Sequence, residues 1–131
     1  MTNIVSIKNL TISFKNNKKV VNNIDINIPK GKTIAIVGES GSGKTLSALS
    51  ILRLLPTSAT IDQGNIIFNE KDLLRLPIKE IEKIRGNRIS TIFQEPMSSL
   101  NPLHKIDKQI KEIITTHRET KINELNQTVL K

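Results

Sequence analysis

The feature that most constrains this chain is a glycine-rich motif that directly follows a short apolar run. Residues 38–45 match the pattern G-x-x-x-x-G-K-[S/T], in which main-chain N–H groups surround phosphate oxygens, the lysine adds positive charge and the hydroxyl binds magnesium. The preceding residues 33–37, Thr-Ile-Ala-Ile-Val, predict a strand. The mostly apolar residues 46–55, which stop at Pro56, predict a helix. Strand, loop and helix in this order predict a site for a nucleoside triphosphate.

A glycine-rich turn that binds nothing is the alternative for this motif. The flanking elements argue against it, because a helix that starts at the loop brings its N–H groups and its positive dipole end to the phosphates. Glycine at positions 41 and 43 lets the backbone turn and approach a ligand closely, since no Cβ intervenes. The residues predicted to bind the nucleotide are Gly38, Glu39, Ser40, Gly41, Ser42, Gly43, Lys44 and Thr45.

Length and composition limit the remaining possibilities. The 131 residues fit one domain, and their excess of Lys and Arg over Asp and Glu, 20 to 12, permits a nucleic-acid or anionic membrane partner. The basic residues are scattered, however, and aromatic residues make up only 2%, so we expect no nucleic-acid partner. An AT-rich genome explains the abundant Lys, Asn and Ile equally well. The absence of cysteine excludes disulfides, and no apolar run is long enough to cross a bilayer, so any membrane association should be peripheral.

The hydrophobic pattern around the motif predicts an α/β fold. Two strands joined by a polar turn predict an antiparallel hairpin, and further strands and helices follow the motif. The predicted elements are hairpin strands 4–14 and 20–28, strand 61–68 with a turn at Gln63-Gly64, a helix through Ile78, Ile81 and Ile84 ending near Gly86, strand 88–93 and helix 106–114.

A second informative segment, residues 92–102, reads Ile-Phe-Gln-Glu-Pro-Met-Ser-Ser-Leu-Asn-Pro and follows the predicted strand 88–93. A glutamine at the end of a core strand is placed to reach the magnesium of a nucleotide or its attacking water. Spacing alone favours the alternative, in which Gln94 is a solvent-exposed residue of a capped turn.

Together these residues resemble the ATP-binding subunits of ABC transporters, in the peptide, dipeptide and nickel importer branch. The resemblance is greatest to its tandem-cassette Yej type, which imports peptides and microcin C. It covers residues 4–117, and the segment 94–102 is far more selective than the phosphate loop. The resemblance implies a P-loop NTPase fold that is incomplete: residues 1–101 form a partial ATPase core with an antiparallel β subdomain, and 102–131 begin a helical subdomain.

The resemblance also implies roles for individual residues. Lys44 would contact the β- and γ-phosphates of ATP, and Thr45 would coordinate Mg²⁺. Gln94 would sense the γ-phosphate through Mg²⁺ or water and couple to the membrane subunit. Phe14 lies where the family places an aromatic residue that stacks on adenine, although a phenylalanine that ends an apolar strand is as often part of the core.

The family's remaining motifs do not occur in these 131 residues: neither Leu-Ser-Gly-Gly-Gln, nor an apolar strand ending in Asp-Glu, nor the switch histidine that follows it. We therefore predict no catalytic residue, and expect His104 and His117 to be solvated or capping side chains. The family is a transport ATPase, but this chain alone is expected to bind ATP at most. Strand 33–37 should lack parallel neighbours, which leaves apolar surface uncovered and stability marginal. Residues 121–131 would continue the helical subdomain.

Three functions fit the sequence. The chain is the N-terminal portion of a peptide importer ATPase, interrupted in its reading frame or cut from a longer protein; or it is a non-hydrolysing nucleotide-binding regulatory module; or, on charge alone, it is a cassette protein that acts on nucleic acid. The first implies membrane-spanning permease subunits and a second ATPase cassette as partners. It also implies a cytoplasmic location, peripheral on the inner face of the cytoplasmic membrane.

Overall fold

The computed structural model describes residues 2–118 and 129, and the chain divides into two compact units, Met1–Ile81 and Glu82–Lys131. Each unit is described by itself. The predicted boundary after residue 101 refers to the subdomains of the family and stays a prediction. The predicted continuation over 121–131 lies outside the described residues, apart from residue 129.

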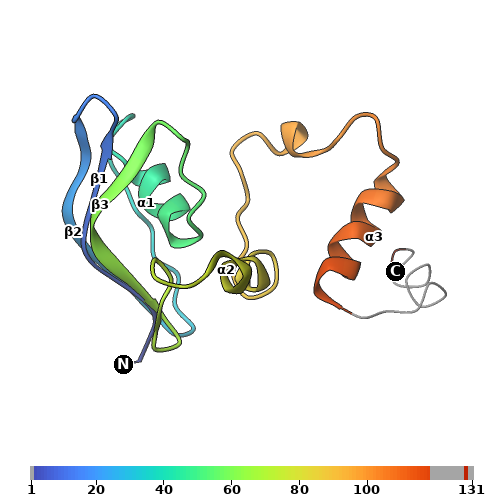
Figure 1. The fold of residues 1–131 in the computed structure, drawn as a ribbon, viewed down its shortest axis with the longest axis horizontal. Helices are drawn as coiled ribbons and strands as arrows, with labels where there is room; N and C mark the ends of the chain where they lie inside the picture. Colours follow the sequence, from blue (N-terminus) through green and yellow to red (C-terminus); the bar gives the residue numbers. More distant parts are fainter. Residues whose placement is uncertain (1, 119–128, 130–131) are drawn as a thin grey trace. The chain divides into compact units, whose positions relative to one another are not determined.

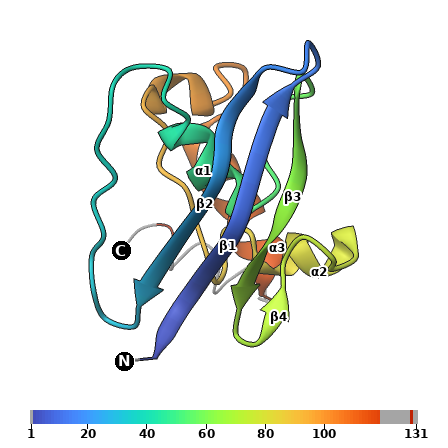
Figure 2. The same ribbon diagram turned by 90° about the vertical axis from the view of Figure 1, so that its left-hand side faces the viewer.

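The first unit is built on a four-stranded antiparallel sheet with the order β2-β1-β3-β4 (Figures 1 and 2). The predicted hairpin is confirmed, because β1 pairs antiparallel with β2. Its turn is closed by a hydrogen bond from the backbone N–H of Asn17 to the carbonyl of Phe14, at 2.9 Å. The strands are β1 (Asn3–Phe14), β2 (Lys19–Pro29), β3 (Ala59–Phe68) and β4 (Lys71–Asp72).

The core of this unit lies between the sheet and helix α1 (Lys44–Ile51), which packs over one face of the sheet (Figures 1 and 2). Burial alternates at Val5 and Ile7 of β1, whereas the residues from Leu10 to Ser13 are all buried. Burial of each large aliphatic side chain contributes about 1.5–3 kcal/mol. The buried apolar residues are Val5, Ile7, Leu10, Ile12, Val21, Leu52, Ala59, Ile66, Phe68, Leu73 and Ile81.

The predicted turn at Gln63-Gly64 is wrong, because β3 continues through both residues. The pairing of β1 with β3 shifts register between Lys8 and Thr11, opposite this point. Gly64 has φ +116°, and a Cβ there would lie 2.8 Å from the Cα of Leu10. Glycine therefore allows a bulge in which two backbones approach closely, rather than a reversal of the chain.

Helix α1 ends at Ile51, four residues before the predicted end at 55. The chain leaves the helix through Arg53, whose φ is +55°. Its N–H bonds to the Ser50 carbonyl and the Leu54 N–H to the Leu49 carbonyl, each at 3.0 Å. This pair of bonds is a Schellman cap. The helix therefore ends at this cap and not at Pro56.

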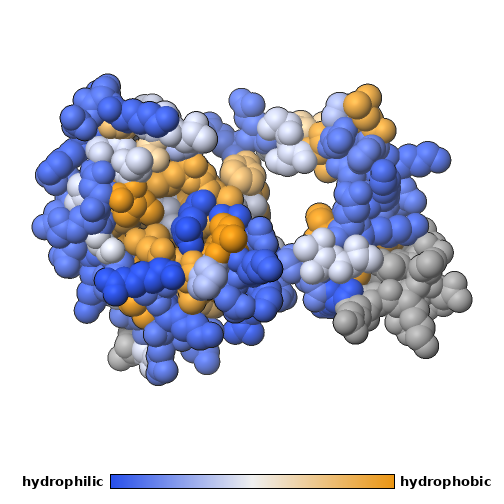
Figure 3. All heavy atoms as spheres, in the orientation of Figure 1, coloured by the Kyte–Doolittle hydropathy of each residue, from blue (hydrophilic) through white to orange (hydrophobic). Residues whose placement is uncertain are grey.

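The strand predicted over residues 33–37 does not form, and all five residues are exposed. The exposed fractions of its apolar side chains are 44% for Ile34, 45% for Ile36 and 90% for Val37. A strand forms only where its N–H and C=O groups find a neighbouring strand, and no strand among the described residues pairs with this segment. The expected uncovered apolar surface is confirmed, and Figure 3 shows apolar side chains at the surface of the first unit.

Helix α2 (Ile78–Ile84) crosses the boundary between the units. Helix α2 confirms the predicted helix. It ends two residues before Gly86, whose φ is +72°. The strand predicted over 88–93 is wrong: the structure has only an isolated bridge between Arg85 and Ile89. Ile92 is 94% exposed, because no described strand lies beside this segment.

The second unit contains the 3₁₀ helix η1 (Pro96–Ser99) and helix α3 (Ile106–His117), which confirms the helix predicted over 106–114 and extends it. The Gln109 side chain fixes the loop before α3. It accepts a hydrogen bond from the Asn101 N–H at 2.9 Å and donates to the carbonyls of Asn101 and His104 at 3.0 and 2.9 Å. The described part of the chain contains no helix long and apolar enough to cross a membrane.

Candidate nucleotide-binding site

The glycine-rich motif forms a loop that leads directly into α1, as the sequence predicts. Helix α1 begins at Lys44 with Gly43 as its N-cap, and no side chain caps it. The free N–H groups of the first helical turn therefore face the loop, where they can donate to an anion. Ser42 stabilises the turn within the loop, since its N–H donates to the carbonyl of Glu39 at 3.3 Å.

Gly43 fixes the loop against the sheet. Its φ is +90°, and a Cβ at this position would lie 2.6 Å from the Cγ2 of Val21 and 3.0 Å from the carbonyl oxygen of Val20. Only glycine therefore allows the start of α1 to lie this close to β2. The local sequence thus explains both the sharp turn and the contact that positions it.

Lys44 places its ammonium group inside the loop. The Nζ atom donates to the carbonyl of Gly38 at 2.7 Å, to the carbonyl of Glu39 at 2.6 Å and to the hydroxyl of Ser42 at 3.2 Å. All three acceptors belong to the motif itself. The ammonium charge is therefore held within the loop by two carbonyl oxygens and one hydroxyl.

A cavity of about 170 Å³ opens beside the loop. Phe14, at the end of β1, lines this cavity and is half-buried, so it belongs neither wholly to the core nor to the solvent. The structure thus brings Phe14 to the loop that the sequence predicts to bind phosphate. Val20 and Leu46 also line the cavity, and the sequence does not distinguish them from other apolar residues of their elements.

The predicted magnesium ligands lie in different parts of the structure. Thr45 is exposed in the first turn of α1, where its hydroxyl is accessible to an ion bound at the loop. Gln94 is exposed ahead of η1 and belongs to the second unit, so its part in the site stays a prediction. Among residues 2–118 and 129, no three His, Cys, Asp or Glu side chains form a group that could hold a metal ion.

A ligand with phosphate groups fits this site better than a metal ion alone. The loop offers one ammonium group and the N–H groups of a helix start, which are donors to anions, while its possible metal ligands are one carboxylate, of Glu39, and three hydroxyls. Mg²⁺ usually takes few protein ligands and completes its shell with phosphate oxygens and water. The arrangement therefore suits a ligand that carries phosphate groups and brings its own metal ion.

Comparison with known proteins places the chain in a family. Residues 21–131 match the family model described as ABC transporter. The chain is 46% identical over 120 residues to the uncharacterized ABC transporter ATP-binding protein YejF of Escherichia coli, covering 88% of this chain and 22% of that protein. It is 42% identical to the peptidoglycan transport ATP-binding protein YejF of Agrobacterium fabrum, covering 97% of this chain and 24% of that one. It is 41% identical to the oligopeptide transport ATP-binding protein OppD of Bacillus subtilis, covering 91% and 34%.

A solved structure supports the fold. The dimeric post-hydrolysis structure of the ATP-binding cassette MJ0796, bound to ADP and Pi, matches with a TM-score of 0.75 at 22% identity. The match covers 96% of this chain and 54% of that one, so this chain corresponds to about half of a cassette. The predicted fold class is confirmed. The chain belongs to the ABC transporter family, and it spans only about a fifth to a third of the length of the relatives named above.

Proposed function

We propose that this chain binds Mg-ATP through residues 38–45 as part of an ATP-binding subunit that powers the import of peptides or peptide-like compounds. The observation that carries the proposal is the position of Lys44 Nζ, held within the loop at the start of α1 by three acceptors of the motif. Membership of the family and the names of its relatives support the transport role.

Binding would proceed by exchange of hydrogen bonds. The Lys44 ammonium group would give up its bonds to the carbonyls of Gly38 and Glu39 and donate to β- and γ-phosphate oxygens instead. An ammonium group bonds more strongly to a negatively charged phosphate oxygen than to a neutral carbonyl oxygen, so this exchange favours the bound state. Phe14 would stack on the adenine, because it lines the cavity next to the loop.

Magnesium, when bound with the nucleotide, would neutralise phosphate charge, and Thr45 and Gln94 would be its protein ligands. Phosphoryl transfer also needs a group that positions the attacking water. The 131 residues contain neither Leu-Ser-Gly-Gly-Gln nor an Asp-Glu pair, which the family uses for closure and chemistry. We therefore expect these residues alone to bind ATP without turnover.

The remaining partners follow from the same proposal. The segment around Gln94 would contact membrane-spanning permease subunits, and a second cassette would face the nucleotide site. The chain would then lie in the cytoplasm against the inner face of the cytoplasmic membrane. Exposure of the apolar side chains Phe93, Met97 and Leu100 near Gln94 is compatible with a protein contact there.

Calorimetric titration with Mg-ATP tests the proposal. The Lys44→Ala variant removes the charged donor, and loss of hydrogen bonds to a charged group costs about 1.5–3 kcal/mol, so binding should weaken roughly ten- to hundredfold. Lys32→Ala is the matched control, since Lys32 is an exposed lysine ahead of the motif. Equal affinity of the two variants, or no uptake of nucleotide by folded wild-type protein, would refute the proposal.

A further inference from the structure

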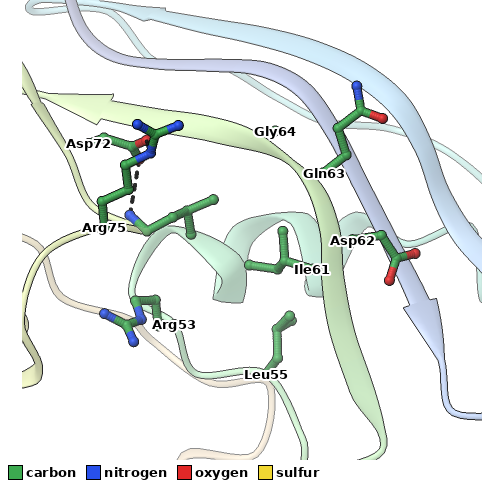
Figure 4. Close-up of a pocket in the computed structure, with 9 residues that line it drawn as sticks. Arg53, Leu55, Ile61, Asp62, Gln63, Gly64, Asp72 and Arg75 are labelled. Carbon is green, nitrogen blue, oxygen red and sulfur yellow. Dashed lines mark hydrogen bonds and ion pairs between the residues drawn. The ribbon is translucent and has the colours of Figure 1, made fainter.

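A second cavity within the first unit is separate from the phosphate loop. It has a volume of about 420 Å³ and shares no lining residue with the cavity beside the loop. It lies between the chain that leaves α1, the middle of β3 and the turn after β4 (Figure 4). This volume falls within the range of about 300–1,000 Å³ that is typical of small-molecule sites.

The walls of this cavity are fixed before any ligand binds. The Schellman cap at Arg53 holds the end of α1, and the Nη1 atom of Arg53 donates to the carbonyl of Leu76 at 2.7 Å. The end of the helix is thereby tied to the segment after β4. On the other side, the carboxylate of Asp72 accepts from the N–H groups of Ile66 and Leu74, at 3.2 and 3.1 Å, which fixes the turn.

The apolar part of the lining consists of Leu55, Ile61 and Leu74, which are all half-buried. Figure 4 shows Leu55 and Ile61 on one side of β3 and the Asp62 carboxylate on the other. Asp62 accepts hydrogen bonds from the hydroxyls of Ser13 and Thr60, at 2.6 and 3.2 Å. The Asp62 carboxylate is therefore held on the side of β3 away from the apolar lining.

Arg75 supplies positive charge at the rim. Its Nε lies 3.4 Å from the carboxylate of Asp72, but the Arg75 side chain is 87% exposed, against 16% for Asp72. A guanidinium group has five N–H donors in a planar fork that suits a carboxylate. The rim thus offers a cation to a ligand whose apolar portion lies against Leu55, Ile61 and Leu74.

From this arrangement we propose that the cavity is a second ligand site, which takes a small carboxylate with a branched or short-chain apolar body. The carboxylate pairs with Arg75, and the apolar body fills the space between Ile61 and Leu74. Two sources carry this chemistry: the C-terminal end of an apolar peptide, and a short acyl acid. The site is distinct from the nucleotide loop and stands independently of the function proposed above.

The test is an NMR titration of the full chain with N-acetyl-leucine, hexanoate and the neutral N-acetyl-leucinamide. At least one carboxylate should produce saturable shifts at the amides of residues 55, 61 and 74, and the neutral analogue should bind about tenfold more weakly or not at all, because it lacks the charge that pairs with arginine. Stronger binding of N-acetyl-leucine assigns the site to peptide ends, and stronger binding of hexanoate to acyl acids.

Arg75→Gln should weaken carboxylate binding about tenfold, whereas the matched exposed variant Arg88→Gln should leave it unchanged. Equal effects of the two variants, equal affinity for N-acetyl-leucine and its amide, or the absence of saturable shifts would each overturn the proposal. If Arg75→Gln does not fold, the proposal is tested by comparing the affinities of the unchanged chain for N-acetyl-leucine and N-acetyl-leucinamide.

Discussion

Replacement of Gly43 by alanine tests the contact that positions the phosphate loop. An alanine at φ +90° must adopt a left-handed conformation, which costs about 1–2 kcal/mol. Its Cβ would also lie 2.6 Å from the Cγ2 of Val21, a buried and β-branched side chain that cannot swing away. Overpacking of this kind costs about 1–3 kcal/mol, so Gly43→Ala should lower the free energy of unfolding by about 2–5 kcal/mol in urea titrations.

Gly41→Ala is the matched control for this prediction. Gly41 has φ +78°, but no atom lies within 4 Å of a Cβ built there, so only the conformational cost of about 1–2 kcal/mol applies. Val21→Ala in the Gly43→Ala background should recover part of the loss, since it removes the closest overlap. If Gly43→Ala is no more destabilising than Gly41→Ala, the proposed packing of the loop against β2 is incorrect.

Two further predictions concern other turns and helices. Asn69 and Glu70, which join β3 to β4, both have positive φ, so Glu70→Gly should raise the free energy of unfolding by about 1 kcal/mol, measured by urea titration. The pKa of Asp107 is lowered by a hydrogen bond from the Lys108 backbone N–H and by the side chain of Lys111. A lowered pKa means that this carboxylate stabilises α3 above its ordinary pKa and ceases to do so as the pH falls through the lowered value. The protection factors of the α3 amides, which correct for the intrinsic pH dependence of exchange, should therefore fall at acidic pH. Asp107→Asn should abolish this fall, and a fall retained in the variant would contradict the assignment.

The sequence predicts those parts of the structure that depend on local patterns. The loop at residues 38–45 is identified by residue type and spacing, and the hairpin of β1 and β2 by alternating apolar residues around a polar turn. Helix α3 follows from the spacing of its isoleucines. In each case the determining contacts lie within a few residues of one another, or across a single tight turn.

The errors arise where a distant part of the chain decides the conformation. Residues 33–37 have the composition of a buried strand, but strand formation needs a hydrogen-bonded neighbour, which the sequence of the segment cannot reveal. The sequence suggests a turn at Gly64, because it does not show that Gly64 lies close to Leu10 of the neighbouring strand β1. The sequence predicts that α1 runs to Pro56, because proline terminates helices, whereas an arginine at positive φ, Arg53, ends the helix.

Some residues of the candidate site can likewise be predicted from the sequence, and others cannot. Lys44 and Thr45 are predicted by the motif alone, whereas the place of Phe14 beside the loop depends on how β1 lies against the start of α1. Gln94 is predicted only from the resemblance to the family, because spacing alone favours an exposed turn residue. The cavity near Arg75 has no sequence motif at all, since it is assembled from three separate segments.

The central claim is that the loop at residues 38–45 binds the phosphate groups of a nucleotide. Calorimetric titration of the same folded protein with ATP, ADP and AMP, each with magnesium, tests it most directly. Lys44 and the loop N–H groups should favour ATP and ADP over AMP at least about tenfold, because each lost charge-assisted hydrogen bond costs about 1.5–3 kcal/mol. Equal affinity for ATP and AMP would contradict the account, since the base and sugar would then supply the binding energy.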